Sequence, residues 1–449
     1  MRQGGLTQWY GYGLLAVLGL IVLHAPLSVW AGSLMPDYSL VIKSWKEIVL
    51  LALLVFAAAI LTKRKLWRAI LADRIIQLCL AYAGLHLLLA VVMPSDVLPT
   101  IAGLMIDLRF IAFFMLLYLA GYLLPGMLSR ALKVTGIGAL IVVGFGILQI
   151  TILPDDFLRI IGYGSDTIRP YTTIDRNPEF VRINSTLRGP NPLGALLVVY
   201  IALLVAYLRQ YWHTRASVDK KIITIGGLAA AGVLFASYSR SAYVAAAVAV
   251  STVLASVWRP SNRAVLVVAA GLLLAGAAAF GLQSTDWYAN VVLHEDPEST
   301  VISKSNPEHL NSLANGLTRV LNQPFGSGVG STGSASLYDD VAANDTIIEN
   351  NYLFVAHESG WLGLGIFIAL FILVLQRLWH RRTEWVSIGL FASGLGLALI
   401  GLLLPVWADD TVSLVWWGLA GVVIGSGIIG DDAARSRQQK TAGTTSVRR

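Results

Sequence analysis

The chain has 449 residues, of which 56% are hydrophobic and 13% are charged, and its mean hydropathy is +0.68. This composition excludes an ordinary soluble globule and predicts an all-α integral membrane protein. The net charge of +7 does not predict a nucleic-acid partner, because in a membrane protein the position of each charge relative to the spans carries the information.

Apolar runs long enough to cross about 30 Å of hydrocarbon recur along the whole chain. The first run is longer than the apolar part of a secretory leader, so we expect it to be retained as a span. The single cysteine, Cys79, lies inside an apolar run, so no disulfide framework is expected. In total we predict twelve spans, centred on residues 10–31, 45–62, 75–93, 102–124, 134–153, 191–208, 222–237, 239–258, 264–283, 351–375, 384–406 and 414–430.

The basic residues give the predicted orientation. With the N-terminus in the cytoplasm, 22 of the 33 Lys and Arg residues fall in cytoplasmic stretches, as the positive-inside rule requires. We therefore expect both termini to be cytoplasmic.

Two connections are long, and both are predicted on the side opposite to the cytoplasm, which is the periplasm if the chain is bacterial. They divide the chain into N-terminal spans (1–153), an arginine-rich loop (154–190), central spans (191–283), a large loop between spans nine and ten (284–350), C-terminal spans (351–430) and a cytoplasmic tail (431–449).

The first long loop carries five arginines and no lysine. Arginine binds phosphate through two parallel hydrogen bonds and stays charged in a partly dry site. Each arginine has an alternative use, which is to pair with one of the acidic residues of the same loop. The five are Arg159, Arg169, Arg176, Arg182 and Arg188.

The second long loop contains a predicted helix, EHLNSLANGLTRVL, followed by the glycine-rich stretch NQPFGSGVGSTGSAS. Leu310, Leu313, Leu317 and Leu321 follow helical spacing, so this helix is expected to lie flat on the membrane or to cover a cavity. The glycines follow no strand and precede no Lys-Ser/Thr pair, which argues against a nucleotide loop. A tight turn whose backbone amides meet an oligosaccharide or an anion is the favoured interpretation, with Gly328 and Gly330 at its centre.

Candidate catalytic groups gather where the spans reach the periplasmic side. Arg240 begins span eight, and Glu349 stands just before span ten, with Asp345 four residues earlier. His357 is eight residues further on, which places it about 12 Å deeper in a straight helix. The general base, which would accept a proton from an attacking hydroxyl group, is therefore predicted to be Glu349, with His357 as the alternative. His357 and Glu358 could instead form a buried polar contact between helices.

The order RINSTLRGPNPLGA, SYSRSAY, LANGLTRVLNQPFGSGVGSTG and ENNYLFVAHESGWLGLG resembles the bacterial O-antigen ligase and O-antigen polymerase family over about residues 180–375. Weaker similarity occurs in SWKEIVLL at 44–51 and IDLRF at 106–110. The resemblance implies a GT-C-like bundle that moves a glycan from undecaprenyl pyrophosphate to an acceptor hydroxyl, with inversion at the anomeric carbon and with no metal or cofactor. The acceptor would be a growing glycan or a lipid A core.

By the same resemblance, Arg240 with Arg182 or Arg188 stabilises the leaving pyrophosphate, while Asn350 and Tyr352 belong to the acceptor side. Many relatives, the ligases especially, have a histidine at the position of Glu349. This departure favours a polymerase over a ligase.

Two other classes of protein share some of these sequence features. A transporter or flippase of lipid-linked glycans would place charges at mid-membrane and use broken helices in two repeated halves. The sequence has Arg109 and His357 within spans but no visible repeat. A purely structural protein would have no use for five arginines in one external loop.

Overall fold

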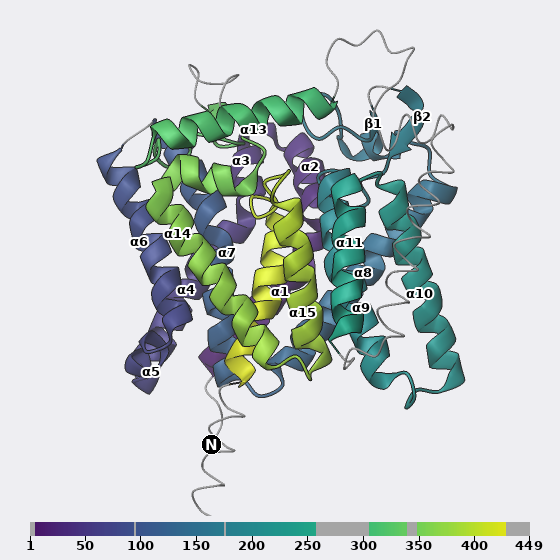
Figure 1. Cartoon of the computed structure of the whole chain (residues 1–449), viewed down its shortest axis with the longest axis horizontal. Helices are drawn as coiled ribbons and strands as arrows, with labels where there is room; N and C mark the ends of the chain where they lie inside the picture. The colour runs from purple at the N-terminus through teal and green to yellow at the C-terminus, as the bar shows by residue number, and fades with distance from the viewer. Residues whose placement is uncertain (1–4, 94–95, 175–176, 257–304, 339–347, 428–449) are drawn as a thin grey trace, which may run out of the picture.

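The computed structural model describes residues 5–93, 96–174, 177–256, 305–338 and 348–427. Figure 1 shows a bundle of helices that run up and down, with one helix laid across the upper end. Seven of the described helices or helix pairs are long and apolar enough to cross a membrane, so the chain is a multi-pass membrane protein.

Described helices lie at the positions of eleven of the twelve predicted spans, and seven of these positions have the length and hydropathy of a membrane span. The ninth predicted span, 264–283, lies outside the described residues. The helices at these positions are α1 (Gly5–Leu20) with α2 (His24–Leu34), α4 (Trp45–Arg64), α6 (Arg74–Val92), α7 (Val97–Leu123), α8 (Met127–Thr151), α9 (Pro190–Tyr211), α10 (Ser217–Ala236), α11 (Arg240–Ala255), α14 (Asn351–His380), α15 (Trp385–Ile400) and a final helix over 410–427.

Shorter elements connect these helices. Those at the helix ends are η1 (Ile21–Leu23), η2 (Pro36–Tyr38), α3 (Ser39–Lys43) and α5 (Trp67–Leu71). Those of the two long loops are η3 (Phe157–Ile161), β1 (Thr172–Ile174), β2 (Asn177–Arg182), α13 (Ser305–Asn322) and η5 (Ser336–Tyr338). The antiparallel pair β1–β2 was not predicted, since only helices were expected.

Local sequence explains several helix boundaries. Asp73 accepts a hydrogen bond from the backbone N–H of Ile75 and so caps α6, and α9 begins with prolines in its first turn, where a missing N–H costs nothing. The centre of the bundle is filled by aromatic side chains of α7, α14 and the final helix; Trp416 and Trp417 are fully buried.

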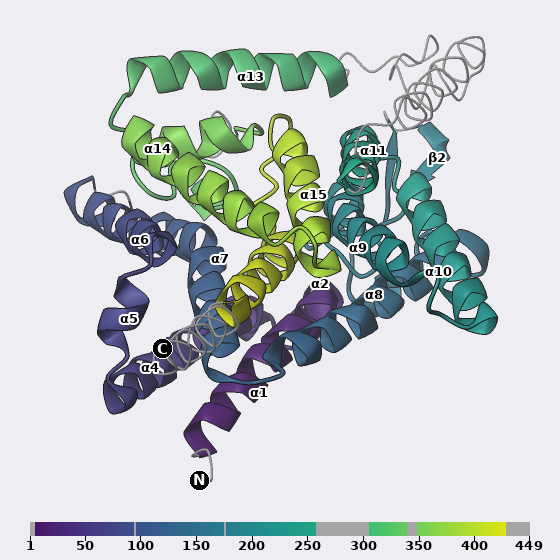
Figure 2. The same cartoon turned by 60° about the horizontal axis from the view of Figure 1, so that its bottom comes forward.

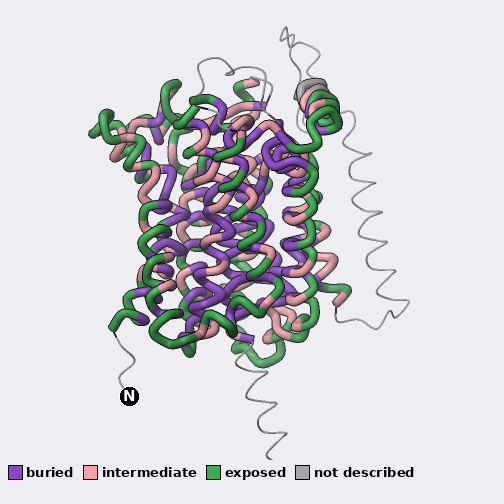
Figure 3. The backbone as a smooth tube through the Cα atoms, turned by 90° about the vertical axis from the view of Figure 1, so that its left-hand side faces the viewer, coloured by how far each residue is buried: buried purple, intermediate pink, exposed green. Residues whose placement is uncertain are grey.

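The final helix lies very close to α7. A Cβ at Gly421 would stand 2.4 Å from the Phe114 carbonyl oxygen, and one at Gly425 would meet that of Tyr118 at 2.0 Å. Small residues four apart allow this approach, as expected for helices that pack in lipid. The view from below in Figure 2 shows this helix passing through the middle of the bundle, and Figure 3 shows buried backbone inside and exposed backbone around the perimeter.

Helix α13 lies across the end of the bundle that is opposite to the first described residues of α1 (Figure 1). Its presence in the second long loop confirms the predicted helix there. We refer to this end of the molecule as the α13 end.

Candidate functional site

Arg182 ends β2 and joins three segments of the chain. Its Nε donates to the Ser237 carbonyl oxygen at 3.0 Å, and its Nη2 donates to Asn191 Oδ1 at 2.7 Å. Ser237 belongs to the turn between α10 and α11, and Asn191 belongs to the first turn of α9. The arginine is thus held in a fixed position at the α13 end.

The turn that Arg182 contacts is the one that carries Arg240. Tyr238 has a φ of 47°, which breaks the chain direction between the two helices, and Arg240 is the first residue of α11. The Arg240 side chain is half-buried. Only two residues separate Ser237 from Arg240, so the structure brings the regions of these two predicted arginines together.

Arg188 is directed elsewhere. It follows the buried segment 183–187 and remains exposed, yet it faces the acidic pair Asp409 and Asp410. Burial by the surrounding protein would lower the pKa of the Arg188 guanidinium, but the two carboxylates outweigh this effect and raise the pKa above its ordinary value. The two carboxylates therefore favour the charged form of Arg188.

The carboxylate of Asp410 belongs to a buried charge cluster that the sequence analysis did not identify. Its Oδ2 lies 3.1 Å from His24 Nε2 and 3.2 Å from Lys46 Nζ. Lys46 also pairs with Glu47 at 3.3 Å, and Glu47 pairs with Arg109 at 3.4 Å. All five side chains are at most 9% exposed.

Charges buried at membrane depth are costly unless they are paired, and they mark functional regions by default. The sequence did contain a sign of this cluster, because charged residues interrupt its apolar runs at Lys46 and Glu47, at Arg109 and at the pair 409–410. Only the spatial arrangement shows that these interruptions belong to one cluster.

Helix α14 bends sharply near its start, in what we call the elbow (residues 357–361). Gly360 has φ 67° and ψ −173°, which is outside the helical region. Figure 1 shows that the first turns run across the bundle and that the remainder descends through it. The bend follows His357, and the first turns do not run along the span (Figure 1), so the eight-residue separation from Glu349 does not translate into a depth of about 12 Å.

The glycine-rich loop (residues 323–333) fills the elbow. Backbone N–H groups of Ser327 and Gly328 donate to the carbonyl oxygens of His357 and Glu358 at 2.6 and 3.2 Å, and Trp361 N donates to Pro324 O at 2.9 Å. These bonds replace the helix bonds that the bend removes.

The side chain of Glu358 binds the same loop. Its Oε1 accepts from the Gly330 N–H at 3.0 Å, and a Cβ at Gly330 would stand 2.2 Å from the Pro99 carbonyl oxygen. The amides of Gly328 and Gly330 are thus engaged within the protein. Their observed use is to hold the loop against α14 and the start of α7.

Glu358 also meets Asp107 of α7. The two carboxyl groups face each other, and His86 Nε2 lies 3.8 Å from Asp107 Oδ2. Glu358 is 1% exposed, and its side-chain hydrogen bond goes to the glycine-rich loop, whereas the alternative in the sequence analysis was a buried contact between helices. His357 is 3% exposed, and its Nδ1 has no hydrogen-bond partner among the described residues.

The segment that precedes α14 holds the predicted base. Glu349 is half-buried, and its backbone N–H donates to Ser312 Oγ of α13 at 3.3 Å. Asn350 caps α14 by accepting from the N–H groups of Tyr352 and Leu353, and its Nδ2 donates to the Leu402 carbonyl oxygen at 2.7 Å. The Tyr352 hydroxyl donates to the Ala398 carbonyl oxygen at 2.9 Å. Asp345 lies outside the described residues.

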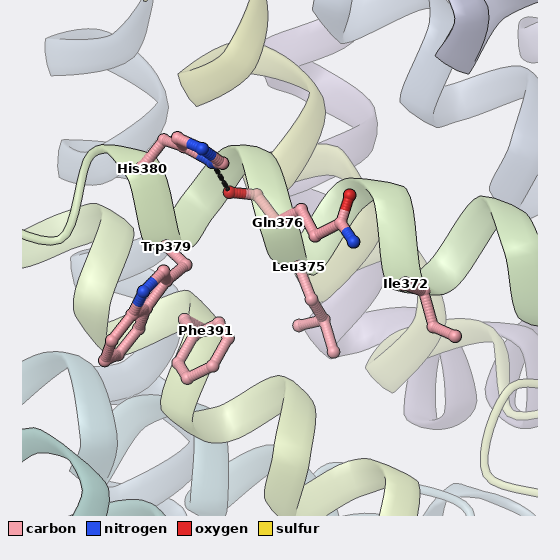
Figure 4. Close-up of a pocket in the computed structure, with 6 residues that line it drawn as sticks. All are labelled: Ile372, Leu375, Gln376, Trp379, His380 and Phe391. Atoms are coloured by element: carbon pink, nitrogen blue, oxygen red, sulfur yellow. Dashed lines mark hydrogen bonds between the residues drawn. The ribbon is translucent and has the colours of Figure 1, made fainter.

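A pocket of about 280 Å³ lies at the opposite end of α14, between that helix and α15. Figure 4 shows its lining, in which a ring nitrogen of His380 meets the backbone oxygen of Gln376 at 2.6 Å. The remaining lining residues are Ile372, Leu375, Trp379 and Phe391. None of the predicted site residues takes part, so this pocket is separate from the candidate site.

Residues 225–368 match the family model of the O-antigen ligase. This range contains Arg240, Glu349 and His357, while Arg182 and Arg188 precede it. The match confirms the resemblance to the O-antigen ligase and polymerase family, and it supports in general terms a membrane glycosyltransferase with a lipid-linked glycan donor and an acceptor. No curated protein matches the chain.

Proposed function

We propose that the protein transfers a glycan from undecaprenyl pyrophosphate to an acceptor hydroxyl at the α13 end, on the periplasmic face of the bacterial inner membrane. The product would be a longer polysaccharide, so the protein would act as a polymerase of repeat units. The observation that supports the proposal best is the contact of Arg182 with the turn that carries Arg240, within and beside the segment that matches the ligase family.

In the proposed reaction, the Glu349 carboxylate accepts the proton of the acceptor hydroxyl. The hydroxyl oxygen attacks the anomeric carbon from the side opposite to the pyrophosphate, and the bond between that carbon and the phosphate oxygen breaks. The configuration inverts, and the pyrophosphate leaves with the electron pair of the broken bond. The guanidinium groups of Arg182 and Arg240 stabilise the charge that develops on it.

Arg188 is the alternative pyrophosphate ligand, and the carboxylates of Asp409 and Asp410 beside it favour the charged form of its guanidinium. His357 remains the alternative base.

The test is transfer by the purified protein. We expect Arg240→Ala and Glu349→Ala to abolish transfer without changing the protein level or the amount of lipid-linked donor. Arg240→Lys should be strongly impaired as well, because an ammonium group cannot make the two-pronged phosphate contact. Arg159→Ala is the matched control: Arg159 lies on the same predicted external loop, is largely exposed and pairs with Asp156 at 3.8 Å. Normal transfer by both alanine variants at 240 and 349 would exclude this mechanism.

The acceptor is tested separately. Undecaprenyl-pyrophosphate oligosaccharide is incubated with the protein, with and without a lipid A core. A ladder of products on the lipid carrier indicates a polymerase, and a single shifted acceptor band indicates a ligase.

A second function, movement of lipid-linked glycan across the membrane, is favoured by the buried charge cluster and by the broken helix α14. In that case a deletion strain would lack donor on the outer leaflet, and the purified protein would not transfer glycan.

A further inference from the structure

Helix α13 presents three different faces around its axis. The face that packs on the protein consists of Ser312, Gly316 and Val320, since a Cβ at Gly316 would meet Ile348 and Leu353 at 3.2 to 3.3 Å. Leu313, Leu317 and Leu321 form a second face and are 39%, 49% and 57% exposed. The polar side chains of Asn315 and Thr318, both exposed, lie on the third.

The angular order of these faces follows from helix geometry. At about 100° per residue, the leucine face lies roughly a third of a turn from the packed face, and the polar face lies roughly a third of a turn further on. Leu313, Leu317 and Leu321 of the predicted apolar stripe thus stand to one side of the packed face and are partly exposed, while the side chain of Leu310 lies outside the described residues. A helix with such a stripe beside a membrane protein suits the boundary between lipid and water.

The leucine face continues into apolar surface of a helix that spans the membrane. Phe325, just after α13, is 81% exposed, and its backbone packs against Gly360 at the elbow. Trp361 and Leu362 follow on α14 at 52% and 65% exposure, and the Trp361 indole N–H donates to the Val320 carbonyl oxygen of α13. Exposed tryptophan at this level is typical of the membrane interface.

We propose that α13 binds the surface of the lipid bilayer, with Leu313, Leu317 and Leu321 inserted among the acyl chains and headgroups beside the elbow of α14. The packed face of α13 then couples membrane binding to the position of the segment before α14. The coupling runs through the hydrogen bond from Glu349 N to Ser312 Oγ and the contact of Gly316 with Ile348 and Leu353. Any effect on glycan transfer rests on the proposed function, whereas binding to lipid does not.

The experiment measures the depth of single positions. The only native cysteine, Cys79, is buried, so a cysteine introduced on α13 can be labelled selectively with the fluorophore NBD. Leu317→Cys and the matched control Asn315→Cys are made in the full chain and reconstituted into vesicles of phosphatidylethanolamine and phosphatidylglycerol. Quenching by brominated acyl chains and by aqueous iodide is then compared.

We expect the label at 317 to be quenched by brominated lipid and protected from iodide, and the label at 315 to show the reverse. Equal exposure of both labels to iodide would overturn the proposal. Lipid-independent protection at 317, together with disulfide cross-linking of Leu317→Cys between two chains, would show that a second copy occupies this face and would also overturn it.

Transfer activity gives a separate readout. Leu317→Asn is expected to weaken transfer in vesicles, and Thr318→Asn on the polar face is not. If lipid quenches the label at 317 but Leu317→Asn transfers normally, the membrane contact stands and its link to the candidate base fails.

Discussion

Replacement of Glu358 separates its role as a hydrogen-bond acceptor from its role as a charge. The side chain is 1% exposed and accepts hydrogen bonds from the backbone N–H groups of Gly330 and Thr332. Glu358→Ala leaves both buried donors without a partner, at a cost of about 1–3 kcal/mol each. Glu358→Gln keeps a side-chain carbonyl oxygen for these donors and removes the carboxyl group.

The energetic cost of Glu358→Ala can be expressed as a change in the fraction of molecules in which the glycine-rich loop is detached from the elbow. A total of about 2–6 kcal/mol raises the population of the detached glycine-rich loop by a factor of about 30 to 10⁴ in Glu358→Ala. Glu358→Gln should shift this population by less than about tenfold, which corresponds to about 1.4 kcal/mol.

Amide hydrogen exchange of residues 327–332 in detergent measures the population directly. Exchange should be much faster in Glu358→Ala and close to native in Glu358→Gln. The reasoning is refuted if the alanine variant keeps native protection, since the bonds to Glu358 would then contribute nothing. It is equally refuted if the glutamine variant exchanges as fast as the alanine variant, since the acceptor role would then not explain the effect.

Three further outcomes are expected. Gly330→Ala should destabilise the protein by a few kcal/mol. The positive φ at this position costs about 1–3 kcal/mol for alanine, and the new methyl group also meets the Pro99 carbonyl oxygen; thermal unfolding measures the change. Arg182→Lys should lower transfer and raise the KM for the lipid-linked donor, because a lysine cannot reach Ser237 and the side chain of Asn191 together. Lys46→Met should cost about 3–5 kcal/mol of stability by leaving buried carboxylates short of a cation, and a much smaller loss in thermal unfolding would show that water reaches the cluster.

The sequence sufficed for the helical membrane fold because long apolar runs have few alternatives in lipid. The choice of Arg182 and Arg240 as pyrophosphate ligands stays a prediction from the resemblance, and the structure brings the regions of these two arginines together. The sequence did not reveal the elbow at Gly360, because a glycine inside an apolar helix looks the same whether it bends the chain or allows close packing.

The charge cluster was missed for a different reason. Lys46, Arg109 and Asp410 lie far apart in the chain, and each alone looks like a tolerated polar residue at or inside a span. Only the packing of α4, α7 and the final helix shows that they neutralise one another.

The contacts group the candidate site into two units. The first contains β2 and the turn before α11, joined by Arg182, and would stabilise the leaving group. The second contains α13, the glycine-rich loop and the start of α14, and would hold Glu349. The residues that follow α15 bond to the second unit: Asn350 Nδ2 donates to the Leu402 carbonyl oxygen, and the Asn351 N–H donates to that of Gly401. Helix α15 itself packs along α9 and α11, the helices that adjoin the first unit. We therefore expect a displacement of the upper end of α15 to change the distance between Glu349 and the two arginines.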